Sequence, residues 1–383
     1  MVATTVSQRR CARFLDFDRQ AGWVQVEAGI TLQYLNARLA AWGMALQAPG
    51  DFDRMTVATA LATGAHGSGR AAPSLAAQVL DLDLVGADGH LLHCSAEVEP
   101  EVFAAARCCL GALGVVARVT LRAVPAFNVV SAELVVPLGE VDLAAEVAGS
   151  EFFSCAWHPH TRRVTLRRRE PTTAPPGGLG YTAWFARHAA RNLAGVAVGA
   201  ATAERVRGLR RAVPPAARVM VHTSPRHYSD RSYRVLVAPR WVGFVESEWA
   251  LPRAQLANAL EELVSWHEQS WARHQGPVVA FPVEVSTGAA DDIWCSAAYG
   301  RDTAYVAARG VAGDETSSFF SALAAIMGPL GGRPRLGSVI TGAAPDLAPR
   351  YPKWAQWHEL RRRLDPQGRL ASPESDRVLG PVR

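Results

Sequence analysis

The chain has 383 residues, of which 49% are hydrophobic and 20% charged, and it carries a formal net charge of +5 with a pI near 9.0. This is the composition of an ordinary globular protein long enough for two or three domains. The excess charge is mostly arginine and shows no basic stripe with interleaved aromatics, which argues against nucleic-acid binding and favours an anionic small molecule or a nucleotide.

Neither the first residues of the sequence nor its cysteines indicate export, and no stretch indicates membrane insertion. Residues 1–13 contain no apolar run, so we expect no signal peptide. The most apolar stretch, residues 193–202, is about half the length that a span needs and is interpreted as a packed helix. The six cysteines include the adjacent Cys108 and Cys109 but no CxxC pair, so we expect reduced thiols and a cytoplasmic protein.

The first predicted elements are a strand and a capped helix. Residues 22–29 alternate apolar and polar side chains, which predicts a strand. Thr31 then has the residue type of a helix N-cap, and the leucines that follow it, Leu32, Leu35 and Leu39, share one helical face that ends at Gly43.

Further along, short strands and helices alternate with turn signals. A change of pattern near residue 126 introduces longer alternating segments typical of antiparallel strands, with helices between them. The predicted elements are a turn at 49–51, strands at 79–85 and 90–95 around an Asp88-Gly89 hairpin, a helix at 100–110, strands at 114–124, 129–136 and 163–167, a loop at 171–180, helices at 254–274 and 354–363, and a turn at 365–368.

These elements predict an α+β protein with two domains. We expect a first domain over residues 1–125, a second over 126–340, and a C-terminal segment, 341–383, that returns to the first domain.

The strongest chemical signal lies between residues 49 and 69. Gly50, Gly64 and Gly67 stand among Ala, Thr and Ser, so a ligand can approach the backbone closely and exposed amides can hold phosphate oxygens. No Gly-Lys-Ser/Thr and no strand-linked GxGxxG is present, which excludes a P-loop and a Rossmann fingerprint. From the residues alone, a glycine-rich structural loop is the alternative.

Residues 24–69 resemble the FAD-binding domain of the vanillyl-alcohol-oxidase (PCMH-type) flavoprotein superfamily, and within it the sugar-1,4-lactone and alditol oxidases. Further segments match that group in order along roughly residues 14–380. They include residues 99–122, 248–252, 281–286 (FPVEVS), 290–305 and 351–366.

The resemblance implies an FAD cofactor and a CH–OH oxidation. It implies that the flavin and pyrophosphate are lined by Gly50, Asp51, Thr56, Val57, Ala60, Thr63, Gly64, His66 and Gly67, and that Gly114, Val115 and Val116 approach the adenine or ribitol end. Glu284 would position the substrate, which would be a polyol or a sugar lactone, with O₂ as electron acceptor.

The sequence departs from that group at four places. The group has an upstream Gly-x-Gly-His-Ser loop whose histidine often links covalently to FAD; nothing in residues 1–13 matches it, so this link is not expected here. The glycine of an Ala-Gly-Ala segment is replaced by Thr59. An arginine two residues after Glu284 is replaced by Ser286, which supplies no charge to a reduced flavin.

The fourth departure concerns the residues that would deprotonate the substrate hydroxyl. Where the group has His-Trp-Gly-Lys, this chain has Arg335-Leu336-Gly337-Ser338. An arginine stays protonated and is a poor general base, but it binds carboxylates or phosphates bidentately. Two hypotheses follow: an oxidase with a changed, anionic substrate held by Arg335, or a catalytically impaired protein that acts as a binding protein on the same fold.

Other candidate sites are weaker. His158-Pro159-His160 lacks an acidic or Cys partner at metal spacing, and the resemblance implies that Asp291-Asp292 belongs to a loop near the substrate pocket, so no metal site is expected. The arginines at 162–163 and 167–169 are typical of a solvated strand face, with phosphate binding as the alternative. Ser224 with His222 and His227 lacks an orienting acid, which argues against a hydrolase triad.

Overall fold

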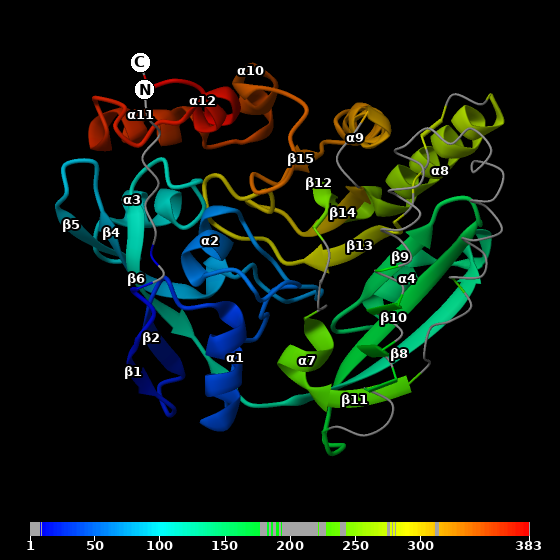
Figure 1. Ribbon diagram of the computed structural model, residues 1–383, viewed down its shortest axis with the longest axis horizontal. Coiled ribbons are helices and arrows are strands. Elements are labelled where there is room, and N and C mark those ends of the chain that lie inside the picture. Colours follow the sequence, from blue (N-terminus) through cyan, green and yellow to red (C-terminus); the bar gives the residue numbers. More distant parts are fainter. Residues whose placement is uncertain are drawn as a thin grey trace.

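The computed structural model describes residues 8, 10–176, 182–183, 185–186, 189–190, 193, 221, 227–237, 243–273, 276–277, 279, 281–310 and 314–382. Figure 1 shows two sheets side by side, with the C-terminal helices lying above the first. This confirms the α+β class predicted from the sequence. The expected helix at 193–202 lies, apart from Leu193, outside the described residues, as do His222 and Ser224.

The first sheet is antiparallel, with strands in the order β1-β2-β6-β4-β5. In β2, Val24 and Val26 are fully buried while Gln25 and Glu27 are half-buried, as the alternating sequence predicted. The strands are β1 (Phe14–Asp18), β2 (Trp23–Glu27), β4 (Val79–Val85), β5 (Leu91–Ser95) and β6 (Val115–Arg122), and a separate pair joins β3 (Met44–Ala45) to β7 (Val124–Pro125).

Helix α1 (Leu32–Ala41) begins and ends where the sequence predicted. The Thr31 hydroxyl accepts a hydrogen bond from the Tyr34 amide, and Gly43 follows the helix with a φ of 71°. Its buried leucines join a core that also contains residues of α2 (Val57–Ala62).

Helix α3 (Pro100–Ala106) is shorter than the predicted helix at 100–110. The Leu110 amide donates to the carbonyl of Ala62 at the end of α2, and Leu110 itself has a φ of 51°. The chain therefore leaves the helix to pair with another segment, which local propensity does not reveal.

The C-terminal segment packs against the first half of the chain. Tyr351, Trp357, Leu360 and Leu379 belong to the same core as Val24 and Leu35. The boundaries expected at 125/126 and 340/341 stay a prediction. The helices of this segment are α10 (Ala344–Leu347), α11 (Trp354–Leu364) and α12 (Pro373–Leu379).

The second sheet has eight strands in the order β11-β8-β10-β9-β13-β14-β12-β15. Strand β10 extends five residues beyond the predicted 163–167, because it pairs with β8 along its whole length. The strands are β8 (Asn128–Pro137), β9 (Ser154–His158), β10 (Arg163–Thr172), β11 (His227–Arg231), β12 (Val245–Pro252), β13 (Val283–Gly288), β14 (Thr303–Gly310) and β15 (Arg333–Pro334).

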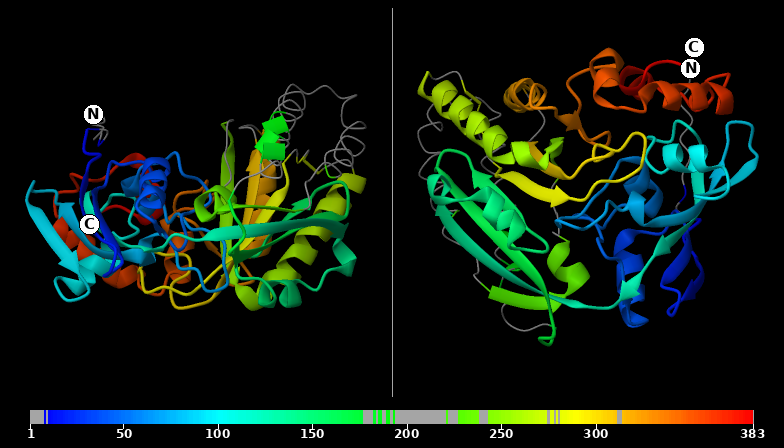
Figure 2. Two further views of the ribbon diagram at one scale, coloured as in Figure 1. Left: turned by 90° about the horizontal axis from the view of Figure 1, so that it is seen from below. Right: turned by 180° about the vertical axis from the view of Figure 1, so that it is seen from behind.

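The two faces of this sheet differ in chemistry. One face packs a second apolar core against helices α4 (Leu143–Ala148), α8 (Leu256–Ala272) and α9 (Asp314–Met327). The strands alternate, so the opposite face carries the intervening residues, and many of these are charged. Figure 2 shows this sheet from two further sides. We call this second face the polar face; short α7 (Ser232–Leu236) follows β11 near one end of the sheet.

The described part of the chain shows neither a membrane-spanning helix nor a cluster of metal ligands. No helix there is both long and apolar enough to cross a bilayer. No group of three or more His, Cys, Asp or Glu residues there is arranged to hold a metal ion.

Candidate active site between the small-residue loop and the polar sheet face

The small-residue loop, residues 47–69, is folded back on itself around α2. The Asp51 amide donates to the carbonyl of His66 over 3.2 Å, which brings the two ends of the loop together. Gly50 has a φ of 83° and Gly64 of 67°, conformations that favour glycine. A Cβ atom at Gly67 would lie 3.7 Å from the Gly50 amide nitrogen, so the two ends of the loop are in van der Waals contact there.

Helix α2 presents hydroxyls on its half-buried side. Thr56 caps the helix by accepting from the Thr59 amide, and its hydroxyl also contacts that of Thr59 over 2.9 Å. The Thr63 hydroxyl donates to the Thr59 carbonyl one turn on. Val57 and Ala60, in contrast, are fully buried in the core, so they support this surface from beneath.

Val115 and Val116 begin strand β6, and Gly114 comes directly before it. A Cβ atom at Gly114 would come within 2.5 Å of Leu84, so packing accounts for this glycine. The carbonyl of Val116 accepts a hydrogen bond from the Gln8 side chain over 2.6 Å. The chain's own atoms therefore engage both residues, and their approach to a cofactor stays a prediction.

His66 is held between the loop and the second sheet. Its ring stacks on Tyr305 of β14 with centroids 3.5 Å apart, and its Nε2 lies 3.1 Å from a Glu248 carboxylate oxygen on β12. Burial opposes protonation, but the charge and hydrogen bond of Glu248 outweigh it, so the pKa of His66 is raised. The side chain thus joins the two halves of the molecule.

Arg335 reaches the same carboxylate from the segment after β15. Its Nε donates to Glu248, one amino group donates to Glu246 over 2.9 Å, and the other donates to the Thr63 carbonyl over 3.2 Å. Burial by itself would raise the pKa of Glu248. The charges and hydrogen bonds of Arg335 and His66 outweigh burial and lower this pKa, so the carboxylate is ionised. Within the described residues, the guanidinium that we predicted to hold an anion is thus directed at the protein's own acceptors.

Glu284 occupies the centre of the polar face. Arg167 of β10 donates to it over 2.5 Å, and an amino group of Arg309 on β14 lies 3.9 Å away. Burial alone raises the pKa of Glu284, but the two arginines lower it to about 2. The carboxylate is therefore an acceptor at any physiological pH.

Together these residues form a continuous series of alternating charges that crosses the polar face and ends in the small-residue loop. Besides the close contact of Arg335 with Glu248, neighbours in the series are 2.5–3.9 Å apart at their nearest atoms. In order they are Glu133, Arg167, Glu284, Arg309, Glu246, Arg335, Glu248 and His66, with Asp51 as a branch 3.6 Å from Arg309. We call this series the charge relay row.

The sequence singled out Glu284, Arg335, His66 and Asp51 as site residues. It did not single out the other members of the row, which are Glu133, Arg167, Glu246, Glu248 and Arg309. These lie on strands β8, β10, β12 and β14, of which β12 and β14 were not predicted, and charged side chains on strands usually face solvent. Only the packing of the first domain against that face shows that they are buried.

The residues present fit one side of an FAD cradle. Gly67 is half-buried, so a ligand can reach part of its backbone, whereas Gly50 is buried and its role beside a cofactor stays a prediction. The threonines at 56, 59 and 63 are half-buried or exposed, while Ala60 and Ala65 are buried. Such a surface suits a planar ring and a pyrophosphate.

The structure shows the surroundings of Ser286 and Ser338, two of the residues at which the sequence departs from the family pattern. Ser286 lies on the polar face, where its strand pairs it with Ser154 and Tyr305. The Ser338 hydroxyl donates to the carbonyl of Arg335 over 2.8 Å and so closes a turn. Neither residue supplies a charge or a base.

The weaker candidates take structural roles. His158 Nε2 pairs with the Thr165 hydroxyl over 2.7 Å, and Asp291 accepts hydrogen bonds from Ser74 and Ser296. Of the arginine run, Arg162 and Arg168 pair with Glu268 and Glu146. These contacts account for the residues without a metal or a phosphate.

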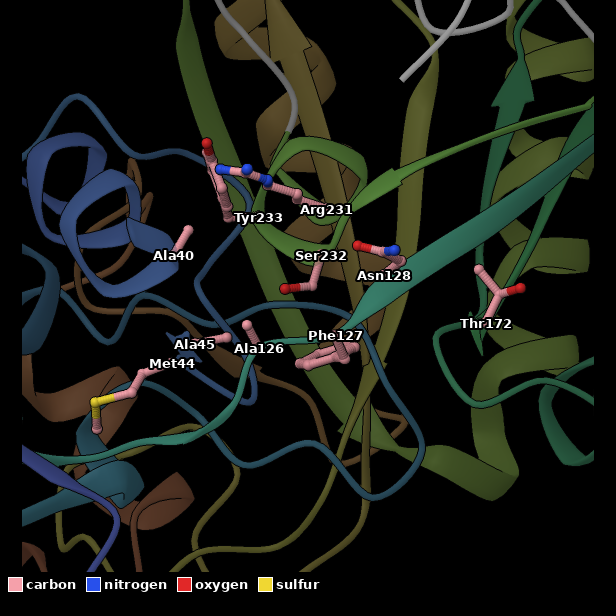
Figure 3. A pocket seen from close by; sticks show the side chains of 10 residues that line it. All are labelled: Ala40, Met44, Ala45, Ala126, Phe127, Asn128, Thr172, Arg231, Ser232 and Tyr233. Carbon is pink, nitrogen blue, oxygen red and sulfur yellow. The ribbon is translucent and has the colours of Figure 1, made fainter. Parts of the chain in front are cut away.

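A separate cavity of about 410 Å³ lies between α1 and α7 (Figure 3). Figure 3 shows Arg231, Tyr233, Ser232 and Asn128 beside Met44 and Phe127 around it. None of the residues predicted from the sequence as site residues lines it, so we place the candidate site at the loop and the polar face.

Comparison with known proteins gives two family matches. The D-arabinono-1,4-lactone oxidase profile matches residues 119–378, and an FAD binding domain profile matches residues 2–95.

Individual relatives match over nearly the whole chain. L-gulono-1,4-lactone dehydrogenase of Mycobacterium tuberculosis is 33% identical, with 96% of this chain and 84% of that protein covered. L-gulonolactone oxidase of Scyliorhinus torazame is 31% identical, with 93% and 81% covered. Cholesterol oxidase from Brevibacterium sterolicum has a similar structure, with a TM-score of 0.78 at 17% identity over 96% of this chain and 83% of that chain, a likeness of fold.

Proposed function

Because the chain belongs to the D-arabinono-1,4-lactone oxidase family, we propose that it is an FAD-dependent enzyme that oxidises a CH–OH group of a sugar-1,4-lactone. The family match carries the reaction class. The observation that carries the site is the charge relay row, which places an ionised carboxylate, Glu284, on the sheet face that meets the small-residue loop.

A bound FAD would supply the hydride acceptor for oxidation of the carbon that bears the hydroxyl. The residues that would hold it are Gly67, through its half-buried backbone, and Thr56 and Thr63, through their hydroxyls. Val57 and Ala60 keep the helix in place from the core. The predicted roles of Gly64, Asp51 and the His66–Gly67 backbone belong to the same surface.

Glu284 orients the substrate. An ionised carboxylate accepts hydrogen bonds and does not donate them, so its oxygens hold hydroxyl groups of a sugar. Arg167 fixes the carboxylate by donating from both amino groups. A pKa of about 2 makes Glu284 a weak base, so we assign it to positioning the hydroxyl through a hydrogen bond.

The charges of the site favour a neutral lactone over an anionic sugar acid. Five carboxylates (Glu133, Glu284, Glu246, Glu248 and Asp51) are matched by the three guanidiniums of the row, by His66 and by the buried Arg169 beside Glu133 and Glu284. Arg335 already donates to two carboxylates and a carbonyl. The site therefore offers no unmatched positive charge to a substrate carboxylate.

The electron acceptor and the cellular location stay predictions. The relatives include oxidases and a dehydrogenase by name, so reoxidation by O₂ is the sequence-based expectation and not a property of every relative. A cytoplasmic location likewise rests on the sequence alone.

Purified protein is assayed with aldono-1,4-lactones, open-chain alditols of the same carbon number and the corresponding aldonate anions, using O₂ or an artificial dye as acceptor. We expect turnover with a lactone and none with the aldonates. Glu284→Gln should lower kcat/KM by about 10²-fold, since it removes a charged hydrogen-bond acceptor. Glu268→Gln, which changes an exposed carboxylate paired with Arg162, is the control.

Absence of turnover with every lactone, in protein that carries FAD, would support the alternative of a binding protein on this fold. Preference for aldonates would contradict the charge argument.

A further inference from the structure

Ser286 stands where the sequence resemblance implies an arginine beside the flavin, and a guanidinium from the neighbouring strand is present nearby. Ser286 lies opposite Tyr305 in the pairing of β13 with β14. Four residues further along β14, on the same face, is Arg309. Glu284, two residues before Ser286, lies opposite Ala307 and therefore between the two positions.

Arg309 connects the substrate sheet with the small-residue loop. Its side chain is 16% exposed, and its Nε donates to Glu246 over 2.6 Å. One amino group lies 3.9 Å from Glu284, and the other lies 3.6 Å from Asp51. Arg309 therefore brings a positive charge from the polar face directly to an acidic residue of the loop.

The amino groups of Arg309 make fewer hydrogen bonds within the protein than those of the other two arginines in the row. Arg167 and Arg335 each use both amino groups in hydrogen bonds within the protein. Among the described residues, Arg309 makes a hydrogen bond through Nε alone, because 3.6 and 3.9 Å exceed hydrogen-bond distance. The guanidinium carbon also lies 5.2 Å from the centroid of the Phe244 ring. Both amino groups of this half-buried cation thus remain to donate to a ligand at the junction.

We propose that Arg309 is the cationic residue of the redox site, taking from β14 the role that Ser286 cannot fill on β13, and that it stabilises the negative charge of the reduced flavin. The inference rests on the proposed function, because it needs FAD beside Gly50 and Asp51. A fixed cation in a partly buried site stabilises a developing anion without reorganisation.

The test compares Arg309→Ser, Arg309→Lys and the double variant Arg309→Ser with Ser286→Arg. Glu246 keeps Arg335 and Glu284 keeps Arg167 as a partner in all three variants. Asp51 loses its ion pair with Arg309 in the serine variants, but its side chain is 49% exposed, so water can solvate the carboxylate. Arg162→Ser, which changes an exposed arginine, is the matched control. Thermal unfolding of each variant verifies that it is folded.

The first readout is the two-electron midpoint potential of the bound FAD without substrate. We expect Arg309→Ser to destabilise the reduced state about 10²-fold, which is about 60 mV more negative at roughly 30 mV per tenfold for two electrons. Arg309→Lys should restore part of the shift, since it keeps the charge. The double variant should restore most of it, because it returns a guanidinium to the adjacent strand.

The second readout is the rate of flavin reduction by the lactone, expected to fall by about 10²–10³-fold in Arg309→Ser. An unchanged potential in a folded Arg309→Ser variant, or a shift of the same size in Arg162→Ser, overturns the proposal. A wild-type flavin that no lactone reduces, but whose potential still shifts in Arg309→Ser, overturns the proposed function and supports the role of Arg309.

Discussion

At the scale of single residues, the molecule buries the ionisable groups of its candidate site in mutually compensating sets. Glu248 illustrates this, since it accepts from His66 and Arg335 while its own side chain is 8% exposed. Breaking a buried pair leaves an uncompensated charge, which costs far more than the intact pair contributes. The charge relay row is therefore both the site's electrostatic frame and a condition for its stability.

Replacing Glu248 by Gln should lower the free energy of unfolding by about 3–5 kcal/mol, because Arg335 and His66 lose their shared counter-charge. Denaturant unfolding measures the change. The matched control is Glu146→Gln, whose partner Arg168 is half-exposed, and there a loss of at most about 1 kcal/mol is expected. Equal losses in the two variants would show that the buried row gives no special stabilisation.

At the scale of elements, helix α8 carries a buried histidine that no proposed step uses. His267 packs edge-on against Trp157 with centroids 5.5 Å apart and lies 4.5 Å from the ring of His160. Burial lowers the pKa of His267 to about 4. The folded protein therefore holds this histidine neutral over a pH range in which the unfolded chain protonates it.

The sign of the effect follows from that difference. The unfolded chain takes up a proton near pH 6.5 and the folded chain near pH 4, so His267 stabilises the fold above pH 6.5 and loses this contribution as the pH falls toward 4. The full contribution is about 3 kcal/mol at 1.36 kcal/mol per pH unit. His267→Gln should flatten the fall in unfolding free energy between pH 6.5 and 4 relative to the wild type. Parallel curves for the two proteins would contradict this.

The elements also show what the sequence could predict. Periodic segments with clear start and stop residues, such as α1 with Thr31 and Gly43, were located correctly because the signal is local. The end of α3 was not, since Leu110 bonds to the distant Ala62. Strand β1 (Phe14–Asp18) was missed because its sequence, FLDFD, is too short for a clear alternation and none of its residues is fully buried.

At the scale of the whole molecule, the candidate site forms only where the part of the chain built on the first sheet meets the part built on the second. The small-residue loop could be predicted from composition and resemblance, because a close backbone approach requires small residues at known positions. The partners of Glu284 could not, since β10, β13 and β14 come together only through the sheet order of the second domain. Nothing in the local sequence distinguishes Arg309, yet it faces Asp51 across that junction.

The same junction explains why loss of charged residues at 286 and 338 does not by itself indicate an inactive protein. The polar face retains an ionised Glu284, and Arg309 lies between it and the loop. We therefore predict that substrate and cofactor meet at this junction and exchange a hydride there.

Mixing the FAD-loaded chain with L-gulono-1,4-lactone or D-arabinono-1,4-lactone without oxygen, and recording the visible spectrum, tests this claim most directly. We predict that the flavin band bleaches with one equivalent of a lactone and that Glu284→Gln slows the bleaching about 10²-fold. A flavin that stays oxidised in the presence of excess lactone, in folded protein, would contradict the claim.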